Sequence, residues 1–353
     1  MKNITGKKDF IEYLRGKSAT FMLSLSYTKT SDIEGITQAG IPKKIYLTPT
    51  LDSEFLAVGE VRSLKDIAKT PKGVPTPALI TRAIHLLKPF KDIEFLDLGL
   101  KVKPQLKGFK IYDFGIKPSG RIDKDAKIDA KRVFKKGLKF AKEYELRSDY
   151  LILAESTPSG TTTAEATAKA LGYDVDGLFS SSFKNSPNNI KQKTIKKALK
   201  KVKKSDGVFK RLSKVSDNML IFYAGFVLGM SKRCPIVLAG GTQMASVLLL
   251  LDKLVCKKGY KLNSKNIALI TTKWVAEDKN SSIKTLLEML SFDIDSYYCD
   301  FDFKASKTPL LKLYDKGEAK EGVGAGASLA YAKINGISNK RIVKKLDNFF
   351  KVG

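Results

Sequence analysis

The sequence is poor in the residues on which many enzymes depend. Its 353 residues include one histidine, His85, and three cysteines, Cys234, Cys256 and Cys299, with no CxxC pair. This scarcity excludes a histidine-rich metal site and disfavours a histidine-based catalytic triad. His85 falls in an expected helix and is interpreted as structural. Unclustered thiols are typical of a reducing compartment, which here predicts the cytoplasm.

Long hydrophobic runs are also missing. The most apolar stretch, Met219 to Met230, covers 12 residues, whereas a membrane-spanning helix needs about 20. The start of the chain, Met1 to Phe10, is charged and lacks the apolar core of a signal peptide. We therefore expect a cytoplasmic protein with no membrane partner.

Arginine is scarce in a strongly basic chain. The net charge is +28, carried by 55 lysines and nine arginines. Such a field attracts phosphates, nucleotides and nucleic acids, but lysine enrichment is also a compositional habit of hyperthermophile proteins. Specific nucleic-acid readers rely on the arginine fork, and no RNP, KH or zinc-finger pattern is present. We expect no nucleic-acid partner, although a lysine-rich nucleic-acid-binding protein stays open as an alternative.

Short β-rich runs alternate with helical patterns along the chain. This alternation predicts an α/β fold with a doubly wound, mostly parallel, Rossmann-like sheet. The expected strands are Thr20–Ser26, Ile45–Leu47, Phe95–Leu98, Tyr150–Ala154, Ile236–Ala239 and Ile267–Thr271, and Cys299–Phe303 is interpreted as an edge strand. The expected helices are Pro77–Leu87, Ile128–Tyr144, Ala164–Leu171, Thr194–Lys203, Gln243–Val255, Ser282–Leu290, Ala325–Asn335 and a last one from about Asn339.

No composition shift marks a domain boundary. We expect residues 1–353 to form one α/β catalytic unit. A smaller lobe is expected from the N- and C-terminal segments, about residues 1–40 and 325–353.

The first candidate binding element follows the expected strand Tyr150–Ala154. A loop of small residues leads to a helix start at Ala164, so backbone N–H groups and the helix dipole can bind an anion there. Its candidate residues are the acid Glu155 and the phosphate-binding Ser159, Gly160, Thr161 and Thr162. The loop lacks the GxxxxGK[ST] pattern of P-loop proteins, and an ordinary capped turn is the alternative.

Two more glycine-rich segments resemble this arrangement. Gly240 and Gly241 follow the expected strand Ile236–Ala239, and the carboxyl ends of parallel strands share one crevice. Glu321, Gly322 and Gly324 precede the helix Ala325–Asn335. Because no strand precedes Glu321, the dinucleotide-binding fingerprint is rejected. The alternative for Glu321 is an acid that caps a helix at the surface.

Together these segments resemble the nicotinate-nucleotide:dimethylbenzimidazole phosphoribosyltransferase family, in its archaeal branch. The resemblance covers roughly residues 148–335, and the matching segments are Glu155 with Ser159–Thr162, Leu238–Gly241, Ala276-Glu277 and Glu321–Ala325. The basic stretch Lys191-Gln192-Lys193 is also similar, as are Leu47–Pro49 and Gly73–Arg82. The Pro-Pro-Gly-Ser-Leu-Gly-type stretch that helps hold the benzimidazole in bacterial members is absent.

The resemblance implies the transfer of 5-phosphoribose from nicotinate mononucleotide to a nitrogen base such as 5,6-dimethylbenzimidazole. The products are nicotinate and an α-ribosyl-base 5′-phosphate for the lower loop of a cobamide. It implies that Glu321 is the base and that Glu155 stabilises the sugar cation. The implied binding residues are Ser159, Gly160, Thr161, Thr162, Lys191, Lys193, Gly240, Gly241, Glu277, Gly322 and Gly324. No cofactor or metal is implied, and family members of this type are dimeric, which favours a homodimer.

A second hypothesis is a nucleotide-binding enzyme of another class that has only the glycine-rich turns in common with this family. A kinase, a dehydrogenase or another nucleotide-binding enzyme would also place such turns at strand ends. This alternative stays open on the sequence.

Overall fold

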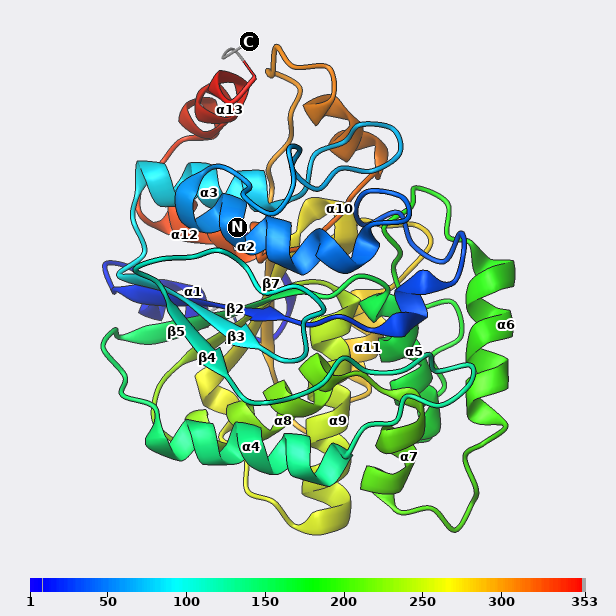
Figure 1. Cartoon of the computed structure of the whole chain (residues 1–353). Helices are drawn as coiled ribbons and strands as arrows, with labels where there is room; N and C mark the ends of the chain where they lie inside the picture. The colour runs from blue at the N-terminus through cyan, green and yellow to red at the C-terminus, as the bar shows by residue number, and fades with distance from the viewer. Residues whose placement is uncertain (8, 351–353) are drawn as a thin grey trace.

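The computed structural model describes residues 1–7 and 9–350, whose strands form one eight-stranded sheet (Figure 1). The order is β1-β8-β7-β6-β5-β2-β3-β4; β1 is antiparallel to β8 and all other pairs are parallel. The predicted α/β fold with a mostly parallel sheet is thus confirmed. The strands are β1 (Lys2–Thr5), β2 (Ala19–Leu25), β3 (Asp92–Asp97), β4 (Lys110–Asp113), β5 (Tyr150–Ser156), β6 (Ile236–Ala239), β7 (Ile267–Thr272) and β8 (Asp295–Cys299).

Helices cover both faces of the sheet. Above it in Figure 1 lie α2 (Thr48–Val58), α3 (Ala78–Leu87), α12 (Ala325–Ile334) and α13 (Asn339–Asn348). Below it lie α4 (Ala130–Glu143), α5 (Gly160–Ala170), α6 (Asn188–Leu199), α7 (Val208–Val215), α8 (Asn218–Met230), α9 (Thr242–Lys258) and α11 (Ile283–Glu288). The remaining elements are α1 (Asp9–Tyr13), α10 (Lys273–Ala276) and the 3₁₀ helices η1 (Lys29–Asp32), η2 (Ile45–Leu47), η3 (Ser264–Asn266) and η4 (Leu311–Lys316).

The central strands are buried on both faces because helices pack on each side. In β5, Leu151 and Leu153 join the lower core with α4, α8 and α9, whereas Ile152 and Ala154 join the upper core with α3 and α12. Successive side chains of a strand point to opposite faces. This explains why such strands are nearly continuous apolar runs in the sequence.

Several predicted elements differ from the structure. Ile45–Leu47 is not a strand but η2, a single 3₁₀ turn that leads directly into α2. Of the expected edge strand Cys299–Phe303 only Cys299 is in a strand, and its strand β8 is interior, between β7 and β1. The apolar stretch from Met219 is α8, which is buried along nearly its whole length and so shows no amphipathic period.

The chain order places a topological switch point between β5 and β2. From β2 the chain adds strands in one direction, and from β5 it adds strands in the other. Ligands of open α/β sheets bind at such a point, outside the carboxyl ends of the strands. We therefore expect a ligand site among the segments that follow β2, β5, β6 and β7.

Two further observations concern the described residues as a whole. None of their helices is both long and apolar enough to cross a membrane. Cys234, Cys256 and Cys299 are all free thiols. The division into a main unit and a smaller terminal lobe stays a prediction.

Candidate active site

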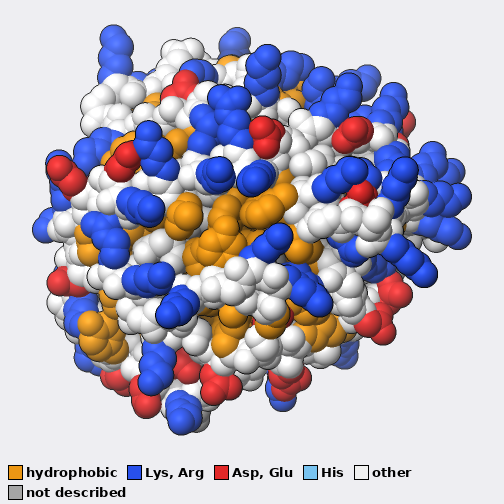
Figure 2. Space-filling model, turned by 90° about the horizontal axis from the view of Figure 1, so that it is seen from below, with side chains coloured by type: hydrophobic (Ala, Val, Ile, Leu, Met, Phe, Trp, Pro, Cys, Tyr) orange, Lys and Arg blue, Asp and Glu red, His pale blue; other side chains and the backbone are white. Residues whose placement is uncertain are grey.

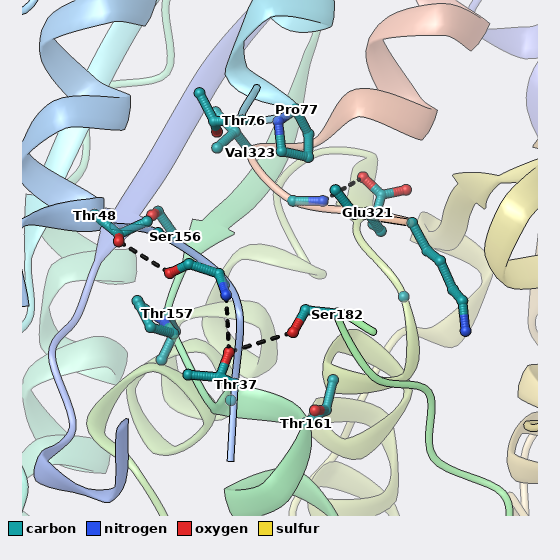
Figure 3. A pocket seen from close by; sticks show the side chains of 18 of the residues that line it. Thr37, Thr48, Thr76, Pro77, Ser156, Thr157, Thr161, Ser182, Glu321 and Val323 are labelled. Carbon is teal, nitrogen blue, oxygen red and sulfur yellow. Dashed lines mark hydrogen bonds between the residues drawn. The ribbon is translucent and has the colours of Figure 1, made fainter. Parts of the chain in front are cut away.

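A cavity opens at the predicted edge of the sheet. Its walls come from segments far apart in the chain: the loop after β2, the start of α2, the segment before α3, the turns after β5 and β6, and the loop before α12. Figure 3 shows side chains from these segments converging around one space, with Thr37 and Ser182 on one side and Glu321 on another. A pocket lined by side chains from several segments thus lies at the switch point of the sheet.

Glu155 lies one residue before the end of β5 and is 7% exposed. Burial raises the pKa of the Glu155 carboxyl to about 8. Gln243 and Thr157 lie beside the carboxyl and offset part of this rise, although neither completes a hydrogen bond to it, and the charges of Asp217 and Glu321 add to it. At neutral pH the carboxyl is therefore mostly protonated in these surroundings.

Four buried polar atoms of this pocket have no hydrogen-bond partner among the described residues. They are Glu155 Oε2, Thr157 Oγ1, Ser159 Oγ and Gln243 Nε2. Each of these residues is more than nine-tenths buried. Leaving a buried polar group unsatisfied costs roughly 1–3 kcal/mol, so the cluster is expected to be satisfied by a polar ligand.

Two helix N-termini meet at the cavity floor. The helix α5 begins at Gly160 rather than at the predicted Ala164, and Ser159 precedes it in a left-handed conformation (φ 64°). A Cβ on Gly160 would lie 2.5 Å from the end of the Gln243 side chain at the start of α9, so a larger residue there would force that side chain to move. Among the described residues, the N–H groups of Thr161, Thr242 and Gln243 have no backbone partner. These groups can bind an anion.

Glu321 is the most strongly coordinated acid of the cavity. Its Oε2 accepts from the Thr272 N–H at 2.9 Å and the Thr271 hydroxyl at 3.3 Å, and its Oε1 accepts from the Gly322 N–H at 3.1 Å. The Gly326 N–H adds contacts of 3.3 Å to both oxygens. Burial raises the pKa of Glu321 to about 7, and these donors hold it below a still higher value.

A strained residue links the two acids. Val323 adopts φ 49°, a left-handed conformation that is costly for a β-branched side chain. Its N–H donates to the Glu155 carbonyl at 3.0 Å, and its own carbonyl accepts from the Thr81 hydroxyl at 2.7 Å. The loop that carries Glu321 is therefore fastened to the backbone of Glu155.

The predicted phosphate lysines do not line the cavity. Lys191 is buried, and its Nζ lies 3.0 Å from Glu165 Oε2 and 3.3 Å from the Ser180 carbonyl. Lys193 lies exposed on α6. The sequence pattern placed both near a helix start, but the helix begins earlier, at Asn188, and Lys191 turns inward to pair with Glu165.

Two other lysines line the cavity instead. Lys320 is 4% exposed, and its Nζ lies 2.7 Å from Asp278 Oδ2. Lys69 is more exposed and pairs with Asp66. Because Lys320 precedes Glu321 directly, it brings a buried cation to the wall that carries the second acid.

The structure brings together only part of the predicted site. The predicted residues that line the cavity are Glu155, Ser159, Gly160, Thr161, Gly241, Glu321 and Gly322. Those that do not are Thr162, Lys191, Lys193, Gly240, Glu277 and Gly324. Glu277 instead accepts from the Tyr298 hydroxyl at the exposed end of β8. Gly324 packs closely against β5, next to Glu155, because a Cβ at position 324 would lie only 2.8 Å from the Ala154 side chain.

Sequence reasoning missed one wall of the cavity almost completely. Asp52 on α2 lines it and accepts hydrogen bonds from the Thr76 hydroxyl at 2.7 Å and the Ser156 hydroxyl at 2.6 Å. The segment Ser180–Ser182 forms another wall. The resemblances at Leu47–Pro49 and Gly73–Arg82 pointed to the segments beside Asp52, but no pattern singled out the acid itself.

Other candidates have structural roles. The His85 ring accepts from the Phe90 N–H at 3.1 Å, and burial lowers the pKa of His85 to about 4. Trp274 stacks on Phe303 within the upper core. The described residues contain no group of three or more His, Cys, Asp or Glu side chains arranged to hold a metal ion.

The whole chain has close curated relatives. A UPF0284 protein of Sulfurisphaera tokodaii is 35% identical over 361 aligned residues, which cover 99% of this chain and 97% of that protein. A UPF0284 protein of Saccharolobus solfataricus is 33% identical and covers 95% of this chain and 93% of its own length. The chain belongs to the UPF0284 family. No family model matches this UPF0284 protein.

Two solved structures share the fold. The nicotinate-nucleotide-dimethylbenzimidazole phosphoribosyltransferase of Thermus thermophilus superposes with a TM-score of 0.61 at 16% identity, over 94% of this chain and 83% of that one. CobT from the same organism superposes with a TM-score of 0.58 at 17% identity, over 94% and 84%. The resemblance inferred from the sequence is thus confirmed at the level of the fold.

Proposed function

We propose that this UPF0284 protein transfers 5-phosphoribose from nicotinate mononucleotide to a nitrogen base of the benzimidazole class. The products are nicotinate and an α-ribosyl-base 5′-phosphate for cobamide assembly. One observation carries the proposal: two acids, Glu155 and Glu321, line one cavity together with unpartnered polar atoms and two helix N-termini of the described chain. The fold shared with the Thermus thermophilus phosphoribosyltransferase supports it.

The reaction requires one bond to form and one to break. A ring nitrogen of the acceptor attacks C1′ of the ribose, and the bond between C1′ and the pyridinium nitrogen breaks. The electron pair of that bond neutralises the departing nicotinate ring, so the leaving group needs no proton. The acceptor N–H proton passes to the Glu321 carboxylate, whose pKa of about 7 suits a base at neutral pH.

Glu155 is assigned to the ribose. Positive charge develops at C1′ in the transition state, and a carboxylate nearby stabilises it. The pyridinium charge of the bound substrate favours the ionised form of Glu155, because an opposite charge lowers the pKa of a carboxyl group. The substrate itself therefore brings about the ionisation that burial suppresses.

The phosphate is assigned to the helix N-termini and the buried lysine. Thr161, Thr242 and Gln243 offer backbone N–H groups, and the dipoles of α5 and α9 favour an anion there. Lys320 supplies a charged hydrogen-bond donor on the neighbouring wall. This assignment replaces Lys191 and Lys193, which lie outside the cavity.

The surface charge supports capture of an anionic substrate. Lysine and arginine side chains are spread over the face seen in Figure 2, and they surround an apolar area. A positive field of this kind raises the rate at which anions are encountered. We further propose a cytoplasmic location, because unclustered free thiols are typical of a reducing compartment, and a homodimer, by analogy with the phosphoribosyltransferase family that the sequence resembles.

The test is incubation of the purified protein with nicotinate mononucleotide and a panel of acceptors, with nicotinate release followed by chromatography. Release that depends on an acceptor base supports the proposal. A melting-temperature increase with ATP or NAD, without one for nicotinate mononucleotide, would instead favour a kinase or a dehydrogenase.

A further inference from the structure

The cavity contains a third acid that the proposed reaction does not use. Asp52 is 3% exposed, and none of the described lysines or arginines forms an ion pair with it. One hydroxyl donates to each of its oxygens, from Thr76 and from Ser156. Each carboxylate oxygen can accept a second hydrogen bond, so Asp52 can still accept donors from a ligand in the cavity.

Asp52 and Glu321 face the cavity from different walls. Asp52 is bonded to Ser156, next in sequence to Glu155, and to Thr76, next to Pro77. Pro77 in turn packs against the Glu321 loop, since a Cβ on Gly322 would lie 3.5 Å from the Pro77 ring. Figure 3 shows Ser156 on one side, Glu321 on the other, and Thr76 and Pro77 between them.

A flat acceptor between these walls has its two edges in different surroundings. With its reacting N–H edge at Glu321, its far edge would lie toward the wall that carries Asp52. A buried carboxylate that meets methyl groups loses solvation without gaining a partner. A carboxylate that meets an amino or hydroxyl group gains a charge-assisted hydrogen bond.

We propose that Asp52 determines acceptor specificity, by selecting fused-ring bases that carry an N–H or O–H donor on the edge opposite the reacting nitrogen. This inference rests on the proposed function. It names the acceptor class: amino- or hydroxy-substituted rings are preferred to 5,6-dimethylbenzimidazole. The absence of the benzimidazole-holding stretch of the bacterial proteins agrees with a different acceptor edge.

The test compares acceptors of matched shape. Nicotinate release is measured with 5-aminobenzimidazole and with 5-methylbenzimidazole, which differ mainly in the donor group. We expect kcat/KM to be about 10- to 100-fold higher for the amino compound, as one hydrogen bond to a charged group permits. Equal values, or a preference for the methyl compound, overturn the inference while leaving the proposed function intact. No nicotinate release with any acceptor overturns both.

A variant pair localises the effect. In Asp52→Asn the ratio between the amino and methyl acceptors should fall to within about threefold, while KM for nicotinate mononucleotide stays at the wild-type value. Asp252→Asn is the matched control, because Asp252 is also buried and held by two hydroxyls, Ser291 and Tyr173, but lies outside the cavity. A ratio unchanged in Asp52→Asn contradicts the inference. Should that variant not fold, the wild-type ratio alone decides.

Discussion

Glu155 and Glu321 reach the same cavity by different structural means. Glu155 is fixed near the end of a buried strand, and its Oε2 has no hydrogen-bond partner among the described residues. Glu321 lies in a glycine-rich loop and accepts from three backbone N–H groups and a hydroxyl. The charge of Glu321 is thus stabilised by donors of the chain itself, whereas the charge of Glu155 lacks such donors. Two carboxylates buried in one cavity therefore differ in the donors that surround them, and this difference separates their pKa values.

The largest effect is expected when the negative charge of Glu321 is removed. Glu321→Gln should lower kcat about 10²- to 10⁴-fold, which is the usual contribution of a general base. Nicotinate mononucleotide should still bind, as measured by calorimetry. Glu277→Gln is the control, because Glu277 lies outside the cavity although the sequence pattern included it. Wild-type turnover by Glu321→Gln would remove the base from the mechanism.

The raised pKa of Glu155 should make the free energy of unfolding depend on pH. The pKa of Glu155 is about 8 in the folded chain, against an ordinary value of 4.5. Between these pH values the unfolded chain loses the proton and the folded chain keeps it, so stability falls as pH rises. Glu155→Gln escapes this loss, and we expect it to gain about 4 kcal/mol over wild type between pH 5 and pH 8.5. Urea unfolding at both pH values measures the difference, and a pH-independent effect would contradict the assignment.

The pH dependence of catalysis sharpens the comparison further. Glu321 must be ionised to accept a proton, and its pKa is about 7. In the presence of saturating donor, kcat/KM for the acceptor should fall about tenfold for each pH unit below this value and level off above it. A profile that is flat between pH 5 and pH 8 would show that no group of this kind limits the reaction.

The smallest expected effect concerns the cation next to Glu321. Lys320→Met should raise KM for nicotinate mononucleotide about tenfold, because one charge-assisted hydrogen bond to the phosphate is lost. Lys193→Met should leave KM within about twofold of wild type, since Lys193 is exposed on α6 away from the cavity. A raised KM in Lys193→Met, with an unchanged KM in Lys320→Met, would instead assign the phosphate to Lys193, as the family resemblance implied.

The sheet could be predicted because buried parallel strands leave a strong signal. For five of the expected strands, both ends lie within three residues of the observed ends, and the ends of Ile236–Ala239 are the same. The failures have physical causes. Ile45–Leu47 has the β-branched and aromatic residues of a strand, but the following Thr48-Pro49 starts a helix. The weakly alternating β4 and the uniformly apolar α8 offer no clear period.

The site could be predicted where backbone geometry defines it. The acids Glu155 and Glu321 and the turn at Gly160 follow from strand–loop–helix patterns and from the family resemblance. Asp52 could not be found this way, because it lies inside α2, which is buried along nearly its whole length and so shows no apolar period that would set the acid apart. The position of Lys191 outside the cavity could not be predicted for a related reason: its inward orientation on α6 depends on a partner, Glu165, that the local sequence does not contain.

The hydrogen bond from Val323 to the Glu155 carbonyl joins positions 168 residues apart in the chain. Neither acid-bearing segment is therefore complete without the other. After a cut in an exposed loop between them, only noncovalent contacts, this hydrogen bond among them, would hold the two segments together, and a graft of one segment onto a foreign scaffold would lose that contact.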